Sequence, residues 1–482
     1  MDSWVAPNTH GWLHAPASDK DWQVLLKRYD ARPNDPLARV YEIARANRCR
    51  SVVEENRYVD PDFRSEYSAF WSQRFADTPA FARRLHFFRR RLRPDDLHRL
   101  PENSGYIGYS TLKPIGRSSG NGRVGRTMLK PPKRLLNAVL TLATDHVSLF
   151  GTPLTVTGAP FYEQDGEFLR CAHVAAWMCH YSAHLKGLAG RQLTAQLVDM
   201  SPSAFTTERD LPSPGLTLNQ IQAIFAATGQ PALFYGLSKM PVVQGVENPP
   251  VKPGPPGYWD TRIFSVICRY LNAGFPVLIG TYNHAFVIVG WFREGKRIRF
   301  IACDDQWGPY ETITSPFTDH RAPWQSIMVP LPPKVYLSGE SAESAAYLQI
   351  RAYGNRKGAP APWRTLSESL SRGEISLRTF LRSNLGYKEG VLDKQRGADA
   401  ERILRLARLA HWVWVVEAHD REKRSLGKPS VLAEFVFDST SNDRLPSPSA
   451  IALPPMVATL SPDDGAGDVV LSTKVPWKSH LP

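Results

Sequence analysis

The middle of this 482-residue chain reads HAFVIVGW over residues 284–291 and FIACDDQWG over residues 300–308. Together with an apolar run at residues 276–282, these segments are almost continuous in Val, Ile, Phe and Ala. That pattern is typical of central strands, which are buried on both faces of a sheet. We therefore expect His284 at the mouth of one strand and a carboxylate, Asp304 or Asp305, at the end of the next. A carboxylate placed in this way can orient the imidazole, and the imidazole can activate a thiol.

Cys171 is the thiol that best fits this arrangement. It opens a segment, residues 172–185, that is rich in small apolar residues and predicts a helix. The unpaired amides and the dipole of a helix N-terminus stabilise a thiolate, which is the reactive form of cysteine. Most cysteines are small core residues. The position at a helix start and the downstream histidine and carboxylate nevertheless favour a nucleophile at this position.

The same segment suggests a competing metal site, because Cys171, His173, Cys179, His180 and His184 all carry possible ligand atoms. His180 and His184 lie four residues apart and would share one face of a helix. Cys171 and His173 would point to different sides, and no second ligand pair follows at the spacing of a zinc finger. We therefore expect no metal and no cofactor, and we interpret His180 and His184 as part of a solvated face.

The two central segments resemble those of a known family. HAFVIVGW is similar to the His-Ala-apolar-Gly-aromatic strand of papain-like cysteine peptidases, and FIACDDQWG resembles their next strand, which ends in Asn-Ser-Trp-Gly. The order of Cys, His and Asn or Asp along the chain also agrees. The resemblance covers about residues 160–331. It implies an α+β fold in which a helix bearing Cys171 packs on an antiparallel sheet bearing the histidine and the aspartate.

The resemblance also implies roles for individual residues. Cys171 is the expected nucleophile, and His284 is the base that holds the thiolate as an ion pair and later protonates the leaving amine. Matching Trp307 to the family's tryptophan puts Asp305 at the position of the orienting Asn. Asp304 is the alternate for that role, because the end of a strand cannot be placed to one residue from sequence.

Two further residues follow from the same resemblance. Gln164 precedes Cys171 by seven residues. It would correspond to the family's oxyanion-hole glutamine, which donates with the cysteine amide to the developing negative oxygen; the alternative is an ordinary loop glutamine. Trp307 would shield the histidine and the aspartate from water, or it is a plain core tryptophan.

The cysteines and the N-terminus bear on the cellular compartment. Five scattered cysteines do not make a disulfide framework and favour a reducing environment. The chain begins without the basic and apolar regions of a secretory signal, and no apolar stretch reaches roughly 18 residues. We expect a cytoplasmic protein without a membrane span. The resemblance then points to bacterial or intracellular branches of the family, similar to bacteriocin-leader peptidase domains, and to a protein or peptide substrate.

Positive charge gathers in the N-terminal third. The formal net charge is +13, and residues 1–150 hold 25 Lys and Arg against 16 Asp and Glu. Within them, the basic segment Lys113 to Arg134 contains seven basic residues and no acid. This segment is a candidate contact for an anionic partner, and the sequence leaves open whether that partner is nucleic acid, an acidic protein or an anionic surface. The alternative is a solvated basic loop.

Length and composition predict three regions, since 482 residues exceed what one core usually supports. Residues 1–157 would form a mixed helical and strand region, a candidate for substrate or partner binding. Residues 158–333 would form the papain-like domain, and residues 334–482 an α+β extension with a Ser/Pro-rich, loosely ordered tail from residue 439. Local patterns in the flanking regions predict helices at 37–47, 62–75, 80–91 and 366–385, and a strand at 343–351.

Three functional classes follow. The first is a cysteine peptidase or isopeptidase that acts through a Cys-His-Asp triad and an acyl-enzyme thioester. The second is a thiol acyltransferase or a transglutaminase-like enzyme, because the same thioester can pass to water or to an amine. The third is a catalytically inactive papain-fold binding protein, suggested by the N-terminal charge and by Ala172 and His173, which depart from the residues that follow the family's cysteine.

Overall fold

A computed structural model describes residues 4–5, 11–29, 34–75, 77–97, 100, 104–115, 124–201, 215–237, 261–294, 297–313, 324–392, 398–426, 428–443, 445–454, 456–459 and 469–471. The chain divides into two compact units. The first contains residues 1–237, 253–259 and 274–332, and the second contains residues 238–252, 260–273 and 333–482. Among the described residues, no helix combines the length and the apolar character that a bilayer crossing needs.

The N-terminal sheet of the first unit has eight antiparallel strands in the order β1-β2-β3-β4-β5-β6-β9-β8. Their bounds are Trp4–Val5 (β1), Gly11–His14 (β2), Ser51–Tyr58 (β3), Ala82–Phe88 (β4), Tyr106–Leu112 (β5), Val124–Leu129 (β6), Ala143–Leu149 (β8) and Thr152–Phe161 (β9). Short 3-10 helices lie at Trp71–Gln73 (η1), Pro94–Leu97 (η2) and Lys133–Leu135 (η4).

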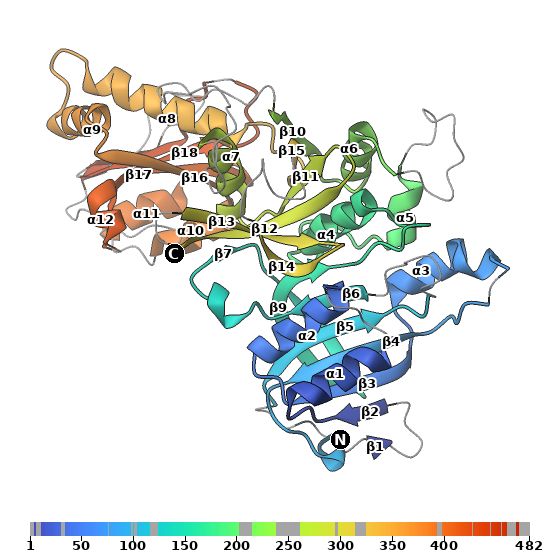
Figure 1. Cartoon of the computed structure of the whole chain (residues 1–482). Coiled ribbons are helices and arrows are strands. Elements are labelled where there is room, and N and C mark those ends of the chain that lie inside the picture. The colour runs from blue at the N-terminus through green and yellow to red at the C-terminus, as the bar shows by residue number, and fades with distance from the viewer. Residues whose placement is uncertain are drawn as a thin grey trace. The chain divides into compact units, whose positions relative to one another are not determined.

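Helices α1 (Asp19–Arg28) and α2 (Pro36–Ala46) cover one face of this sheet (Figure 1). Both begin at clear caps: Ser18 forms a capping box before α1, and Asp35 precedes the N1 proline of α2. Alternate strand residues then divide between two cores. Val52 packs with the residues of α1 and α2, whereas its neighbour Val53 belongs to a separate core cluster. The alternation follows from the pleat of the strand, which turns successive side chains to opposite faces.

The central sheet, also in the first unit, carries the segments quoted at the outset. Its strands are ordered β10-β15-β11-β12-β13-β14, with β7 paired to β12. Their bounds are Val139–Leu140 (β7), Ala232–Gly236 (β10), Val277–Thr281 (β11), Ala285–Glu294 (β12), Arg297–Asp304 (β13), Gly308–Ile313 (β14) and Trp324–Pro330 (β15). Gly290 lets β7 approach β12, because a Cβ atom there would lie 2.3 Å from the Val139 carbonyl oxygen.

Helix α4 (Cys171–Leu185) packs against β11 and β12 of the central sheet and against β8 and β9 of the N-terminal sheet. It is buried from Ala172 to Ala183, which explains its small apolar residues. Helices α5 (Thr194–Asp199) and α6 (Leu218–Ala227) contact it, while α3 (Pro61–Ala69) contacts α5. Tyr310 joins the two sheets: its hydroxyl donates to the Leu129 carbonyl (2.7 Å) and accepts from the Ala159 amide (2.8 Å).

The second unit contains the C-terminal sheet, with strands in the order β16-β17-β18-β19-β20-β21. Its strands are Ile375–Ser383 (β16), Trp412–Asp420 (β17), Val431–Asp438 (β18), Ala450–Leu453 (β19), Met456–Thr459 (β20) and Val469–Leu471 (β21). Its helices are Thr261–Asn272 (α7), Gly339–Gly354 (α8), Ala361–Ser371 (α9), Asn384–Leu392 (α10), Ala398–Leu406 (α11) and Arg421–Ser425 (α12). Buried Arg269 of α7 bonds Glu340 (3.2 Å) and Glu343 (2.8 Å) of α8.

The predicted α+β class is confirmed, because the described residues form twelve α-helices and three antiparallel sheets (Figure 1). The helix predicted at 37–47 is confirmed as α2, and the helix predicted after Cys171 as α4. The predicted domain boundary between residues 157 and 158 falls inside β9, which pairs with β6 and β8. The residues on both sides of it share the first compact unit.

Several local predictions are wrong. Residues 82–88 form strand β4 instead of part of a helix, because they pair with both β3 and β5. Residues 343–351 lie in helix α8 instead of a strand. The helix predicted at 366–385 ends at Ser371, and β16 follows. The tail beyond residue 439 contributes three strands to the C-terminal sheet, where it was predicted to be loosely ordered.

Candidate active site

The Cys171 thiol stands at the first residue of α4, where the chain leaves the loop after β9. The preceding residue, Arg170, donates its backbone N–H to Nδ1 of His173 (3.2 Å), which caps the helix start. Burial and the nearby Arg170 lower the pKa of His173 to about 4, so this imidazole is neutral and can accept that bond. Cys171 itself is half-buried, unlike the apolar residues that follow it.

His284 is fixed by the tight connection between β11 and β12. Its backbone carbonyl accepts from the amide (2.8 Å) and the hydroxyl (3.1 Å) of Thr281, and its own amide donates to that hydroxyl (3.1 Å). The imidazole stacks on Phe286 with ring centroids 6.0 Å apart. The backbone bonds and the ring contact therefore restrict both the position and the tilt of the imidazole.

Asp304 holds the other side of the imidazole. Its Oδ1 lies 3.1 Å from Nε2 of His284, and Oδ1 of Asp305 lies 3.7 Å from the same nitrogen. A turn at the end of β13 fixes Asp304, since Oδ1 also accepts from the Gln306 amide (3.0 Å) and its carbonyl accepts from the Trp307 amide (3.0 Å). The resemblance predicts Asp305 as the orienting residue, but the hydrogen bond goes to the alternate, Asp304.

These contacts set the charge of His284. Burial lowers its pKa, but the hydrogen bond to Asp304, the Cys171 side chain and the charges of Asp304 and Asp305 outweigh burial and raise the pKa to about 10. His284 is therefore an imidazolium at neutral pH. Its second nitrogen, Nδ1, is buried and makes no hydrogen bond of normal geometry to a described residue, although the Cys171 side chain is near enough to affect the pKa of the ring.

The other four cysteines differ from Cys171 in burial. Cys49, Cys179, Cys268 and Cys303 are buried, and none of the five cysteines forms a disulfide. Burial raises the pKa of Cys49 and Cys303 to about 12 and raises the pKa of Cys179 and Cys268 well above its ordinary value. At neutral pH these four thiols are protonated and shielded, which leaves Cys171 as the accessible one.

Gln164 and Trp307 lie close in the chain to Cys171 and to Asp304, respectively. Gln164 is half-buried in the loop between β9 and α4, and within the described residues no hydrogen bond joins it to His284 or the two aspartates. Trp307 is half-buried in the turn that follows Asp304. Their roles as oxyanion donor and as shield therefore stay predictions.

The two sets of possible metal ligands differ in whether their ligand atoms lie close together. The histidines of α4 make separate structural contacts: His180 Nδ1 meets Gln230 (2.8 Å), and His184 Nδ1 meets the Ala189 carbonyl (3.2 Å). His180 is buried, so it is not part of a solvated face. By contrast, ligand atoms of His284, Asp304 and Asp305 lie within 4.8 Å of one another, close enough to hold a cation. That set is the same histidine-carboxylate cluster that faces Cys171.

The basic segment Lys113 to Arg134 has a structural role that sequence reasoning missed. Lys113 is buried, with Nζ 3.6 Å from Glu66 and donating to the Glu163 carbonyl (3.2 Å) in the loop before Cys171. Arg126 is buried and bonds Asp60 (3.0 Å). These two cations are thus neutralised inside the fold. Lys133 and Arg134 are exposed, and residues 116–123 lie outside the described residues.

The loop before Cys171 is anchored by the same buried network. Oδ1 of Asp165 accepts the backbone N–H groups of Glu167 (2.8 Å), Phe168 (2.7 Å) and Leu169 (3.0 Å). Burial, more than any neighbouring charge, raises the pKa of Glu66 to about 7, although Lys113 opposes the shift. The sequence did not predict these ion pairs of Lys113, because no acidic residue lies near it in the chain. Its partners come from α3 and from the loop after β9.

Comparison of the chain with protein-family models found no match, and comparison with curated proteins found none either.

Proposed function

We propose that this chain is a papain-like cysteine peptidase or isopeptidase, with Cys171 as nucleophile, His284 as acid and base, and Asp304 as the residue that orients the imidazole. The supporting observation is the arrangement around one ring. Nε2 of His284 bonds Asp304 (3.1 Å), Nδ1 makes no hydrogen bond of normal geometry in the described part of the chain, and the Cys171 side chain helps to raise the pKa of that ring to about 10.

The first half-reaction uses the imidazolium as an acid. The Cys171 thiolate attacks the substrate carbonyl carbon and forms a C–S bond, and the carbonyl oxygen becomes an oxyanion. The Cys171 amide at the start of α4 has no helical acceptor, so it can donate to this oxygen, with the Gln164 side chain as the predicted second donor. The C–N bond then breaks as Nδ1 of His284 gives its proton to the leaving nitrogen.

The second half-reaction restores the site. Neutral His284 removes a proton from water while the water oxygen attacks the thioester carbonyl. The C–S bond breaks and returns the Cys171 thiolate, the carboxylic acid product leaves and loses its proton to solvent, and His284 is again an imidazolium. Asp304 supports each proton transfer because it holds Nε2 and leaves Nδ1 directed to the reaction.

The test is selective alkylation under native conditions. Iodoacetamide at pH 7.5 should modify Cys171 with one equivalent, while the four buried cysteines stay unmodified, as read by intact mass and peptide mapping. Cys171→Ala should take up no label. His284→Ala should react roughly tenfold more slowly or worse, because it loses the cation that stabilises the thiolate. His146→Ala, which changes an exposed histidine on β8, is the matched control and should behave as the wild type.

Other outcomes separate the alternatives. Labelling of another cysteine, or of none, contradicts the proposal. If a labelled protein transfers acyl groups to an added amine faster than to water, the thiol acyltransferase or transglutaminase-like class is favoured. If Cys171 is labelled but a peptide library and casein are neither cleaved nor modified, the inactive papain-fold binding protein is favoured.

A further inference from the structure

A second site opens in the first unit, in a cavity of about 540 Å³. This volume lies within the range of small-molecule sites, roughly 300–1,000 Å³. None of the described residues that line the cavity belongs to the site around Cys171. The lining combines four arginines with an apolar wall that includes a buried tryptophan: Arg45, Arg48, Arg50, Arg91, Trp22 and Pro16.

The charge of this cavity is unbalanced. None of the nine described residues that line it is acidic. Arg45 forms an ion pair with Asp19, an exposed residue outside the cavity. Arg48, Arg50 and Arg91 form no ion pair with any described residue. Neighbouring cations repel one another, and an anion that binds between them removes that repulsion.

The backbone beneath the arginines is rigid. The Arg48 amide donates to the Arg45 carbonyl (2.8 Å) and the Cys49 amide donates to the Ala44 carbonyl (2.9 Å), which is a Schellman ending of α2. Arg48 occupies the left-handed position of this motif, with φ of 61°, where glycine is usual. The sequence thus places an arginine at a strained position that glycine would fill with less strain.

Arg50 and Arg91 are brought together by contacts between β3 and the segment after β4. The Arg50 amide donates to the Phe88 carbonyl (2.8 Å), and the Leu92 amide donates to the Ser51 hydroxyl (2.8 Å). The dipole at the end of α2 favours a cation in its last turn, such as Arg45. It does not explain Arg50 or Arg91, which lie outside that helix. Three chain segments therefore converge to form one cationic cavity.

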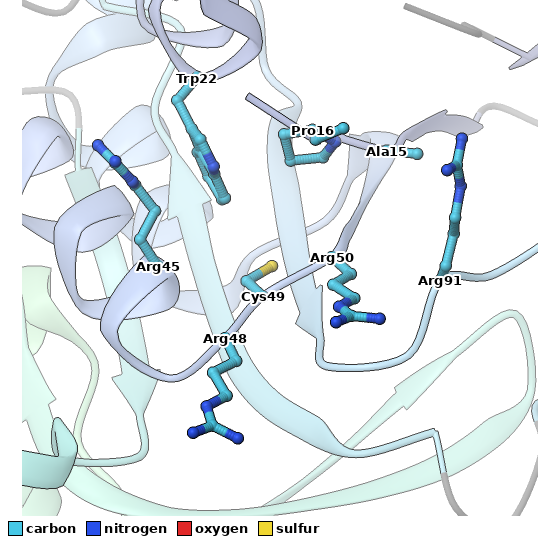
Figure 2. Close-up of a pocket in the computed structure, with 9 residues that line it drawn as sticks. Ala15, Pro16, Trp22, Arg45, Arg48, Cys49, Arg50 and Arg91 are labelled. Carbon is cyan, nitrogen blue, oxygen red and sulfur yellow. The ribbon is translucent and has the colours of Figure 1, made fainter. Parts of the chain in front are cut away.

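Figure 2 shows Trp22 and Pro16 on one side of Cys49 and Arg48 and Arg50 on the other, with Arg45 and Arg91 at the two flanks. Guanidinium groups bind phosphate oxygens through paired N–H donors, and separated guanidiniums suit a ligand with several phosphates. The Trp22 and Pro16 side can contact a ring or a chain. We propose that this cavity binds an organic polyphosphate, such as a nucleoside triphosphate, with the phosphates on the arginines and the organic group on the apolar wall.

The experiment measures binding to the full chain by calorimetry at low salt, with ATP, tripolyphosphate and adenosine as probes. ATP should bind most tightly, tripolyphosphate more weakly and adenosine not detectably. Arg50→Ala and Arg91→Ala should each weaken ATP binding tenfold or more. Arg402→Ala, which removes an exposed arginine in the second unit, should leave ATP binding unchanged.

Arg48→Gly separates binding from folding. Glycine suits the left-handed position, so the thermal midpoint of this variant should equal or exceed that of the wild type, while ATP affinity falls several-fold. The proposal is overturned if ATP does not bind at millimolar concentration, if the arginine variants bind ATP as the wild type does, or if ATP and tripolyphosphate bind equally well. Binding of an oligonucleotide without binding of ATP also overturns it. The labelling of Cys171 is independent of all these results.

Discussion

Nε2 of His284 lies 3.1 Å from Oδ1 of Asp304, and that same oxygen accepts the backbone N–H of Gln306 at 3.0 Å. The turn at the end of β13 therefore fixes the position of the Asp304 carboxylate, and the carboxylate in turn orients the imidazole. Asp305 follows in the chain at 3.7 Å from the same nitrogen and acts on the imidazole mainly through its charge. This difference in distance gives the two aspartates distinguishable roles.

Replacing Asp304 should reduce activity more than replacing Asp305. Asp304→Ala removes the acceptor that orients the imidazole, and we expect a loss of about 10²–10⁴-fold in kcat, the usual contribution of a positioned acid–base group. Asp305→Ala should cost less, because its oxygen is farther from Nε2. The kcat of both variants is measured with the best peptide from a cleavage screen. The pKa of His284 in each variant is measured by NMR.

Asp304→Asn is the matched control, since an amide oxygen can still accept from Nε2 at this position. It should recover a large part of the activity that Asp304→Ala loses. Equal activity of Asp304→Ala and the wild type would contradict an orienting role for Asp304.

The stability of the protein should depend on pH through His284. Its pKa is about 10 in the fold, against an ordinary value near 6.5, so the folded state holds a proton that the unfolded state releases first. The stabilisation is complete below about pH 6.5 and is lost as the pH rises toward 10. Urea unfolding of the wild type and of His284→Gln, measured from pH 6 to 10.5, should show a difference in unfolding free energy that declines over this window. A constant difference would contradict the raised pKa.

Removal of divalent metal should leave the site unchanged. The close approach of His284, Asp304 and Asp305 could hold a cation. If the triad is the working form, however, EDTA should change neither the alkylation rate of Cys171 nor peptide cleavage. Loss of either after EDTA treatment, with recovery on adding zinc or magnesium, would instead assign these residues to a metal site.

Gly290→Ala should destabilise the central sheet. The new methyl group would meet the Val139 carbonyl oxygen at 2.3 Å and a Leu140 methyl at 2.6 Å. We expect the free energy of unfolding to fall by about 1–3 kcal/mol, the usual cost of overpacking. Gly190→Ala is the control, because no atom lies within 4 Å of its new methyl group. Urea titration of both variants against the wild type measures the difference.

Local signals predicted the elements whose own residues determine them. The helix predicted at 37–47 forms as α2, and the Asp35 side chain caps its start. The apolar runs predict β11, β12 and β13 because these strands are buried on both faces and need no alternation. The sequence likewise predicted a helix that begins at Cys171, because α4 is buried along its length and is therefore rich in small apolar residues.

Predictions failed where distant residues decide the structure. Residues 82–88 carry a helix-like pattern after Thr78 and Pro79, but every one of them except Arg83 is buried, because β3 and β5 pair on both sides. The sequence also did not indicate that the hydrogen bond of His284 goes to Asp304 instead of Asp305. The pairing of β13 with β14 shifts between Ala302 and Asp304, so counting back from Trp307 does not give the side-chain direction.

The sequence by itself therefore determined the α+β class, the three consecutive central strands and the residues that carry reactive groups, since each depends on local pattern and residue type. Only the tertiary structure decided that Asp304 holds His284, that Lys113 and Arg126 are buried in ion pairs, and that Arg48, Arg50 and Arg91 share one cavity. These relationships join residues that are far apart in the chain: 66 positions separate Arg126 from Asp60, and 113 separate Cys171 from His284. Register shifts and packing set such distances, and neither is encoded in any short segment.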